Sequence, residues 1–325
     1  MKLATVNDGT PDGCLVVVSR QLQSVIPAQP IARTMQEALD NWDEVVRPLQ
    51  ALYEQLNAGR VEQAAPYAQT RFMAPLPRAW QWLDGSAFPQ HGKLMAEAFH
   101  HAPIESDFPL MYQGLSHMFH GPDDDIPFAS EADGIDCEGE FGIVTGPVAK
   151  GTLANDAAAF IRLVVQINDW SLRRYAPIEM KTGFGWILSK PACSAAPLAV
   201  TPDELGKSWY QNRVIARLEV KRNGNVIGLV PANEMEYGFD ELIAHAACTR
   251  SLCAGSIIGS GTVSHSDYRR VGSCCISEQR AIEMIDSGTP TTPFLKFGDR
   301  VSMRAFSDQD SLPLFGVMDQ RVISG

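Results

Sequence analysis

Short apolar runs separated by turn-forming residues dominate the hydrophobic pattern of this chain. From Phe72 onward these runs alternate with Gly, Pro, Asn and Asp, which is typical of an antiparallel or mixed β architecture rather than of repeated βαβ units. The clearest predicted strands are Glu140–Thr145, Ile161–Ile167, Val214–Lys221, Asn225–Leu229 and Arg300–Phe306. Asn223-Gly224 predicts a hairpin turn, and Phe239–Thr249 has the apolar spacing of a helix.

The first part of the chain shows a different pattern. Lys2–Val6 and Cys14–Arg20 predict a hairpin, with Gly and Asp between them supplying the turn. Thr34 can cap a helix whose apolar residues recur on one face until Pro48 interrupts it; the pattern then resumes, and Gly59 ends it. We therefore predict a small α+β unit ahead of the strand-rich region.

These two regions suggest two domains. We predict a small N-terminal α+β domain over residues 1–70 and a β-rich domain over residues 71–325, which makes the fold class α+β. A chain of 325 residues with 45% hydrophobic and 20% charged residues can bury a large core. Its 26 glycines and 21 prolines favour many turns over a helical bundle.

The charge balance bears on the possible partners. A net charge of −11, with no concentrated basic patch, disfavours binding to nucleic acid or to an anionic membrane. No run of about eighteen apolar residues occurs, and Met1–Gly9 lacks the apolar core of a signal peptide. We expect a cytoplasmic protein with no nucleic-acid or membrane partner.

Seven cysteines are present, an odd number without a Cys-x-x-Cys spacing. This pattern supports neither a disulfide framework nor a zinc knuckle. Buried reduced thiols are expected, and a redox role for the adjacent pair Cys274-Cys275 is the less favoured interpretation.

Two glutamates carry the first chemical signal. In a strand, two-residue alternation places Glu138 and Glu140 on one face and apolar neighbours on the other. A third carboxylate, Asp169, follows the apolar run Ile161–Ile167. Oxygen ligands of this kind suit Mg²⁺, Mn²⁺ or Ca²⁺ better than zinc. The alternative is the solvated face of an amphipathic strand.

Three further motifs could belong to a site. Asp84 and His91 place a carboxylate and an imidazole in one short segment, Lys190 follows a glycine-punctuated loop, and Gly255–Thr262 exposes backbone N–H groups and hydroxyls. A surface histidine, a solvated lysine and a tight turn remain the alternatives. The absence of Gly-x-Gly-x-x-Gly argues against a dinucleotide site. His117–His120 and Asp123–Asp125 resemble another metal site, but a polar turn fits them better, and His100-His101 is similarly uninformative.

Taken together, these motifs resemble the fumarylacetoacetate hydrolase family, and specifically its bacterial fumarylacetoacetase-type members. The resemblance spans about residues 70 to 325 in consistent order. The matching segments are Ala74–Trp80, Asp84–His91, Ile135–Gly146, Asn168–Arg173, Gly183–Pro191, Gly255–Ser264 and Phe297–Asp299.

The resemblance implies a mixed β-sandwich roll behind a small N-terminal domain, assembled as a homodimer. It also implies a divalent cation, with Mg²⁺ expected first and Ca²⁺ or Mn²⁺ as alternatives. Its ligands would be Glu138, Glu140, Asp169 and Asp84. The implied catalytic and substrate-binding residues are His91, Lys190, Arg173 and Thr262.

Some positions depart from the family pattern. The family histidine is commonly supported by a glutamate, but direct register places Ile276 there, with Glu278 two residues later as the candidate partner. Ser86, a candidate substrate contact, stands where the animal enzymes carry an aromatic residue. Ala176 and Met180 replace polar or aromatic substrate contacts. These changes leave the metal chemistry intact and loosen the inference about the substrate.

The expected function is metal-dependent hydrolysis of a carbon–carbon bond in a 1,3-diketo acid. The resemblance favours cleavage of fumarylacetoacetate to fumarate and acetoacetate, in tyrosine or homogentisate breakdown. His91 would activate a water molecule, and Lys190 and Arg173 would balance the oxyanion. The alternatives are an acylpyruvate hydrolase, an oxo-acid decarboxylase or isomerase, and an inactive metal-binding paralogue.

Overall fold

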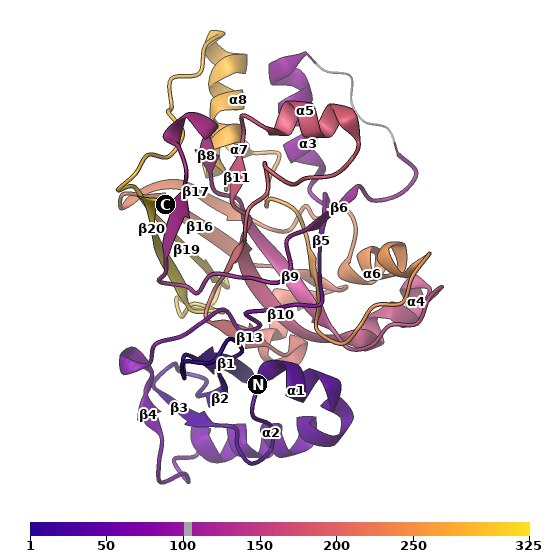
Figure 1. The fold of residues 1–325 in the computed structure, drawn as a ribbon, viewed down its shortest axis with the longest axis vertical. Coiled ribbons are helices and arrows are strands. Elements are labelled where there is room, and N and C mark those ends of the chain that lie inside the picture. The colour runs from indigo at the N-terminus through magenta and orange to yellow at the C-terminus, as the bar shows by residue number, and fades with distance from the viewer. Residues whose placement is uncertain (101–105) are drawn as a thin grey trace.

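A long mixed sheet runs through the molecule (Figure 1). Its strands are β1 (Lys2–Val6), β2 (Cys14–Val18), β3 (Ser24–Pro27), β4 (Ala65–Pro66), β5 (Gln81–Gly85), β6 (Met111–Gly114), β9 (Gly139–Thr145), β10 (Ile161–Asn168), β12 (Ser194–Ala195), β13 (Leu198–Val200) and β18 (Ser256–Gly259). In the computed structural model, which describes residues 1–100 and 106–325, these eleven strands follow the order β4-β3-β2-β1-β13-β10-β9-β18-β5-β6, with β12 beside β10. Because β1 pairs with β13, the N-terminal strands extend the central sheet.

A second sheet packs against one face of the long sheet. It contains β7 (Asp125–Phe128), β16 (Arg217–Arg222), β17 (Asn225–Pro231), β19 (Arg300–Phe306) and β20 (Val317–Ser324), in the order β17-β16-β19-β20-β7. Phe141 and Ile143 from β9 share a hydrophobic core with Leu218 and Val220 from β16. This contact forms a sandwich. Short pairs are formed by β8 (Ile135–Asp136) with β11 (Ser171–Leu172) and by β14 (Trp209–Tyr210) with β15 (Arg213–Val214).

Helices α1 (Met35–Asp40) and α2 (Trp42–Asn57) cover the other face of the long sheet at its N-terminal end (Figure 1). Leu39 and Leu49 share a second core with Leu163 and Val165 of β10, so the N-terminal part and the central strands are packed together. The other helices are α3 (Pro89–Phe99), α4 (Ala154–Ala157), α5 (Ala176–Thr182), α6 (Phe239–Ala247), α7 (Tyr268–Val271) and α8 (Ile276–Ser287). Short 3-10 turns cover Tyr67–Gln69, Glu131–Asp133, Ala158–Phe160 and Pro202–Ser208.

The predicted interruption at Pro48 is wrong. The chain breaks instead at Asn41, which ends α1 and precedes α2, and its side-chain amide donates to the carbonyl of Glu37 at 2.9 Å. Pro48 lies inside α2 on its exposed side, where water can reach the carbonyl that loses its partner. Thr34 does cap α1, as expected: its hydroxyl accepts from Glu37 N–H.

Most predicted strands are present, with shifted ends. Arg300–Phe306 has the predicted bounds, whereas the run Val214–Lys221 is split between β15 and β16. Asn223 and Gly224 have φ values of 51° and 80°, as a tight hairpin turn requires. Helices α3 and α8 were not predicted, although they carry residues of the site.

Three other expectations can be compared with the structure. None of the seven cysteines, all within the described residues, forms a disulfide; four are buried, but Cys14 is half-buried and Cys248 and Cys253 are exposed, so the expectation of buried thiols is wrong for these three. Within residues 1–100 and 106–325, no helix has the length and apolar character needed to cross a bilayer. His101, one of the histidines given no role above, lies outside the described residues.

Candidate active site and metal centre

Three carboxylates meet where strands of the long sheet end. Asp84 lies in β5, Glu140 in β9, and Asp169 directly follows β10. One oxygen of each lies within 4.8 Å of the others, and we call these three residues the carboxylate cluster. Strand β18 separates β9 from β5 and places Gly259 opposite Asp84. A Cβ at Gly259 would lie 2.3 Å from Asp84 Oδ1, so this position needs glycine for the cluster to fit.

The cluster is buried and short of hydrogen-bond donors. Glu140 is fully buried, and among the described residues neither of its carboxylate oxygens has a hydrogen-bond partner. Asp84 accepts the N–H of Gly261 at 2.9 Å. Burial, followed by the charge of Asp169, raises the pKa of Asp84 well above its usual value, and burial followed by the charge of Asp84 does the same for the pKa of Glu140. Such oxygens suit a hard cation, which would neutralise the crowded charge.

Asp169 is the member of the cluster with the most protein contacts. Its Oδ2 accepts from the Tyr112 hydroxyl at 2.6 Å and from the Lys190 ammonium at 2.5 Å. Its Oδ1 accepts from the Cys193 thiol at 3.0 Å. Burial raises the pKa of Asp169, while the charge of Lys190 acts against this shift. These contacts fix the orientation of the carboxylate.

Glu138 lies in a different environment from Glu140. Arg173 donates to Glu138 at 2.6 Å and to Asp136 at 2.9 Å, and Lys190 also donates to Glu138. We call Asp136, Glu138, Arg173 and Lys190 the ion-pair network. Burial opposes ionisation of Glu138, but the charges of Lys190 and Arg173 outweigh it and hold its pKa far below the usual range. The solvated-face alternative is therefore wrong for both glutamates, which are 4% and 0% exposed.

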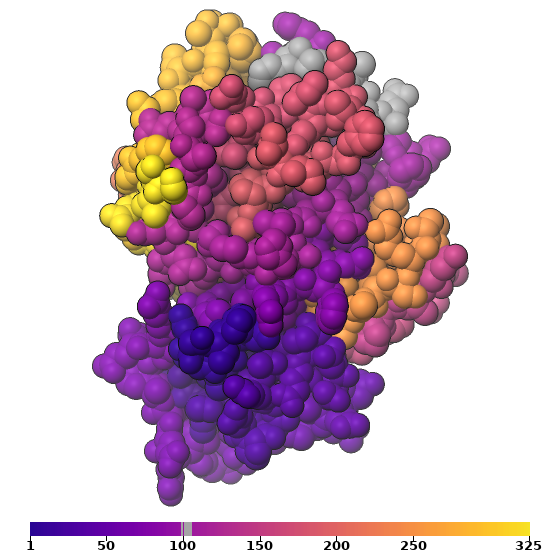
Figure 2. Space-filling view, viewed as in Figure 1, coloured from indigo at the N-terminus to yellow at the C-terminus, as the bar shows by residue number. Residues whose placement is uncertain are grey.

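A surface loop brings Lys190 into this network. Glu179 of α5 accepts the backbone N–H groups of Ile187, Leu188 and Ser189 at 3.1, 2.7 and 3.0 Å. The helix and its loop lie on the surface in rose in Figure 2, whereas the Lys190 side chain is 10% exposed. The neighbouring carboxylates outweigh burial and raise the pKa of Lys190, so its ammonium persists.

His91 and Glu278 come together across the molecule. His91 lies in the first turn of α3 and Glu278 in the first turn of α8, and the two helices pack against each other. His91 Nδ1 is 2.8 Å from Glu278 Oε1. The direct-register position Ile276 is instead buried at the start of α8. Glu138 forms an isolated antiparallel bridge with Cys275, which places the start of α8 beside the ion-pair network.

The two predicted substrate contacts lie on neighbouring loops. The Ala87 N–H, next to Ser86, donates to the Ser260 carbonyl at 2.9 Å, so the loop at Ser86 touches the loop that leads to Thr262. Ser86 is exposed and Thr262 is buried. Nothing in this geometry tests their contact with a substrate, and both remain predictions.

Three residues with evident roles around the site escaped sequence reasoning. Tyr112 and Cys193 hold Asp169, and Asp136 holds Arg173 together with the backbone N–H groups at the start of α8. The signal for Asp136 was present, since it extends the two-residue alternation of Glu138 and Glu140 by one step. Tyr112 and Cys193 lie in segments that showed no polar pattern.

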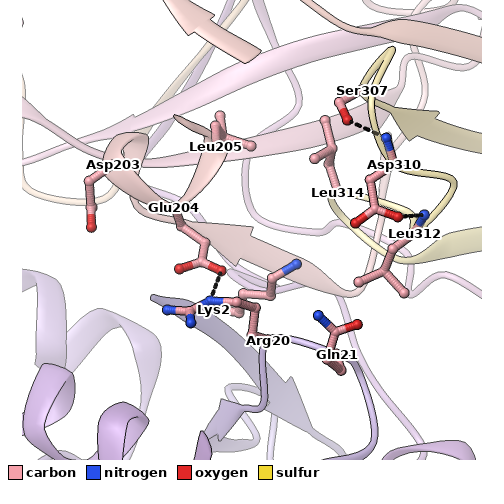
Figure 3. A pocket seen from close by; sticks show the side chains of 10 residues that line it. All are labelled: Lys2, Arg20, Gln21, Asp203, Glu204, Leu205, Ser307, Asp310, Leu312 and Leu314. Atoms are coloured by element: carbon pink, nitrogen blue, oxygen red, sulfur yellow. Dashed lines mark hydrogen bonds and ion pairs between the residues drawn. The ribbon is translucent and has the colours of Figure 1, made fainter. Parts of the chain in front are cut away.

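A hollow of about 330 Å³ lies elsewhere, between the N-terminal strands and the C-terminal part of the chain (Figure 3). Lys2, Arg20 and Glu204 are among its lining residues, and Arg20 pairs with Glu204 at 3.3 Å. None of its lining residues belongs to the carboxylate cluster or to the ion-pair network. Neither of the two groups of possible metal-ligating side chains found among the described residues includes a residue of this hollow, so we place the chemistry at the carboxylates.

Comparison with known proteins gives the chain a family. Residues 1–78 match the fumarylacetoacetase N-terminal domain 2, and residues 81–323 match the fumarylacetoacetate hydrolase C-terminal domain. The mitochondrial oxaloacetate tautomerase Fahd2a of Rattus norvegicus is 27% identical over 47% of this chain and 48% of its own length. The human mitochondrial oxaloacetate tautomerase FAHD2B is 24% identical over 61% of this chain and 60% of its own length. The matched segments thus span half to three fifths of these relatives.

Solved structures agree on the fold. Maleylpyruvate hydrolase from Sphingobium sp. SYK-6, in complex with manganese(II) and pyruvate, superposes with a TM-score of 0.68 at 16% identity, over 100% of both chains. This confirms the predicted strand-rich α+β fold. Since the two matched domains together cover nearly the whole sequence, the chain belongs to the fumarylacetoacetate hydrolase family.

Proposed function

We propose that this protein is a divalent-cation-dependent enzyme that hydrolyses a carbon–carbon bond in a 1,3-diketo acid. The observation that carries the proposal is the contact between His91 and Glu278 at 2.8 Å, on elements that adjoin buried carboxylates. A histidine oriented by a carboxylate is the arrangement needed to activate water. The family supports the same class of chemistry.

The chain's own residues fit a hard cation. Asp84, Glu140 and Asp169 would hold it, and Glu138, joined to Asp169 through Lys190, is the fourth ligand that the resemblance implies. When bound, the cation would draw electron density from both carbonyl oxygens of a 1,3-diketo acid. Oxygen-only ligands favour Mg²⁺, with Mn²⁺ or Ca²⁺ as alternatives; the maleylpyruvate hydrolase neighbour contains manganese.

His91 would act as the general base. Because a carboxylate only accepts hydrogen bonds, the contact with Glu278 places the imidazole proton on Nδ1 and leaves Nε2 free to accept a proton. The His91 side chain is 23% exposed, whereas that of Glu278 is 1% exposed. Water can therefore reach the imidazole, while its partner stays buried. Nε2 would take a proton from the water that attacks the substrate carbonyl.

Lys190 and Arg173 would stabilise negative charge. The charges of Glu138 and Asp136 raise the pKa of Arg173 against the effect of burial, so both side chains stay positive. They would offer hydrogen bonds to the oxyanion or to the substrate carboxylate. Ser86 and Thr262 would line the same space from the two touching loops.

The substrate is open to a second candidate. Sequence resemblance favours fumarylacetoacetate, in tyrosine and aromatic degradation, and acylpyruvates are the nearest alternative. The rat and human relatives favour keto–enol tautomerisation of oxaloacetate, because both are named for that reaction. Enolate stabilisation would serve either reaction, but only hydrolysis needs the activated water.

The decisive experiment combines a substrate panel with one conservative variant. Fumarylacetoacetate, acylpyruvates and oxaloacetate would be assayed with Mg²⁺, Mn²⁺ or Ca²⁺. We expect Glu278→Gln to lower diketo-acid hydrolysis by about 10² to 10⁴-fold, because the base loses its orientation. Glu97→Gln, a change at an exposed residue of α3, is the matched control.

Each outcome of the panel selects one interpretation. Oxaloacetate turnover without hydrolysis, unchanged in Glu278→Gln, would favour the tautomerase. A wild-type protein that binds Mg²⁺ but turns over no substrate would favour the inactive paralogue. The homodimer, also a proposal, can be checked by light scattering on the purified protein.

A further inference from the structure

We propose a second cation site, for Zn²⁺ or another borderline ion, formed by His91, Cys275 and Glu278. One ligand atom from each residue lies within 4.8 Å of the other two. A tetrahedral zinc ion with bonds of about 2.0 to 2.3 Å separates its ligands by about 3.5 Å, so small side-chain movements suffice. The site shares no residue with the carboxylate cluster.

Two of the three ligands are buried and firmly held. Cys275 is fully buried and caps α8, with its Sγ accepting the Glu278 N–H at 3.3 Å. Asp136 accepts the N–H groups of Ile276 and Ser277 at 2.8 and 2.9 Å, which fixes the first turn of the helix. The sulfur therefore has a defined position beside Glu278.

The Glu278 carboxylate has an unused ligand atom. Its Oε1 faces His91 at 2.8 Å, but its Oε2, although buried, has no hydrogen-bond partner among the described residues. A buried carboxylate oxygen without a donor is destabilising, and a cation would satisfy it. The partly exposed His91 provides the route by which an ion would enter.

The donor set selects a different class of ion from that of the carboxylate cluster. Sulfur, nitrogen and oxygen from Cys275, His91 and Glu278 are the donors that zinc prefers, with a fourth position open. On binding, the Cys275 thiol would release its proton to solvent, and the imidazole would carry its proton on Nε2 instead of Nδ1. The thiolate and the carboxylate would then balance the two positive charges of the ion.

Occupancy would also switch off the proposed base. Once Nδ1 binds the ion, the proton on Nε2 removes the lone pair that would accept a proton from water. Zn²⁺ would therefore inhibit hydrolysis without displacing Mg²⁺ from the carboxylate cluster. This consequence rests on the proposed function, whereas the binding itself does not.

Cobalt(II) provides a readout that is independent of turnover. With the carboxylate cluster saturated by Mg²⁺, one equivalent of Co²⁺ should produce thiolate-to-cobalt charge-transfer absorption in the near ultraviolet and intense tetrahedral bands in the visible. Added Zn²⁺ should abolish both. Cys275→Ser should abolish both as well, since serine caps helices well but is a poor zinc ligand.

Two matched variants locate the sulfur. Cys193→Ser removes the thiol beside Asp169, and Cys253→Ser removes an exposed thiol; neither should change the Co²⁺ spectrum. Bands lost in Cys193→Ser but kept in Cys275→Ser would place the ion at the carboxylate cluster and overturn the proposal. Absence of the bands in wild-type protein would overturn it too, and thermal unfolding would verify that Cys275→Ser is folded.

The inhibitory consequence is tested separately. Zn²⁺ should inhibit the wild-type hydrolase at saturating Mg²⁺, and Cys275→Ser should resist it by at least about tenfold in concentration, each relative to its own uninhibited rate. Cobalt bands without Zn²⁺ inhibition would retain the cation site and refute the role of His91 as base. Inhibition equal in both proteins would show that Zn²⁺ acts elsewhere.

Discussion

Glu138 and Glu140 are two residues apart and both are buried, yet their surroundings shift their pKa values in opposite directions. Around Glu138, Arg173 and Lys190 supply the compensating charge, and the pKa of Glu138 is lowered. Around Glu140, burial together with the charges of Asp84 and Asp169 raises its pKa. The ion-pair network thus pairs two carboxylates with two cationic side chains, whereas among the described residues the three carboxylates of the cluster share one ion pair, from Lys190 to Asp169. The difference teaches that burial alone does not set the direction of a carboxylate's pKa shift, because the charges of the neighbouring side chains decide it.

The largest expected effect comes from Glu140→Gln. Removing one negative oxygen from the proposed cation site should cost about 4 kcal/mol of transition-state stabilisation, or about 10³-fold in kcat/KM. Steady-state kinetics and Mg²⁺ titration calorimetry would measure it. Stability of the cation-free protein should change by no more than about 1 kcal/mol, because within residues 1–100 and 106–325 the Glu140 carboxylate has no hydrogen-bond partner to lose. Full activity in this variant would contradict the assignment of Glu140 as a cation ligand.

The matched change in the ion-pair network, Glu138→Gln, should lower the stability of the folded protein. It would leave Arg173 and Lys190 with less compensation in a buried setting, which costs about 3 to 5 kcal/mol when one partner of a buried pair is removed. Urea unfolding of the cation-free protein would measure the loss. If Glu138→Gln and Glu140→Gln destabilise the protein equally, the contrast between the two regions does not hold.

Adding a cation should sharpen the same contrast. At a Mg²⁺ concentration of 100 times its dissociation constant, binding to the folded state alone would stabilise the wild-type protein by about 2.7 kcal/mol. Thermal unfolding with and without Mg²⁺ would show an increase in the midpoint that is absent in Glu140→Gln. An equal increase in that variant would mean that the cation binds elsewhere, and chelator should reverse the wild-type shift.

The smallest effect concerns His120, which belongs to neither region. Burial lowers its pKa, while the charge of Asp124 opposes the shift. The unfolded chain therefore binds a proton at a higher pH than the folded chain, so the stabilising contribution is present above about pH 6.5 and is lost as the pH falls below it. Between about pH 7.5 and about pH 5.5, the free energy of unfolding should fall less in His120→Gln than in the wild-type protein. An identical loss would assign the acid sensitivity to other groups.

Much of the strand pattern and the acidic residues could be predicted, because both depend on local order along the chain. Alternation predicted Glu138 and Glu140 on one strand face, but β9 begins at Gly139 and leaves Glu138 just ahead of it. The end of an apolar run located Asp169. The same logic could not show that Glu138 would meet Arg173 and Lys190 while Glu140 met Asp84. Local order gives the face of a strand, whereas the partners on that face come from distant loops.

The partner of His91 shows the same limit. His91 and Glu278 are separated by 187 residues and meet because α3 packs against α8. The first turn of α8 begins with a cysteine cap, an unusual start that pattern rules do not recognise. The break at Asn41 was missed for a related reason, since a side-chain contact within α1 ended the helix before the proline was reached.

Lys190 joins the two regions through a single ammonium group, because it contacts both Glu138 and Asp169. A cation that takes Asp169 as a ligand must share the carboxylate of Asp169 with the Lys190 ammonium. By thermodynamic reciprocity, the ion pairs of Lys190 would weaken binding of the cation by the same free energy by which the bound cation weakens those ion pairs. One coupling energy would therefore govern both the affinity for the cation and the freedom of Lys190 to contact a substrate. The loop that sets the position of Lys190 is itself held by hydrogen bonds from its backbone N–H groups to Glu179.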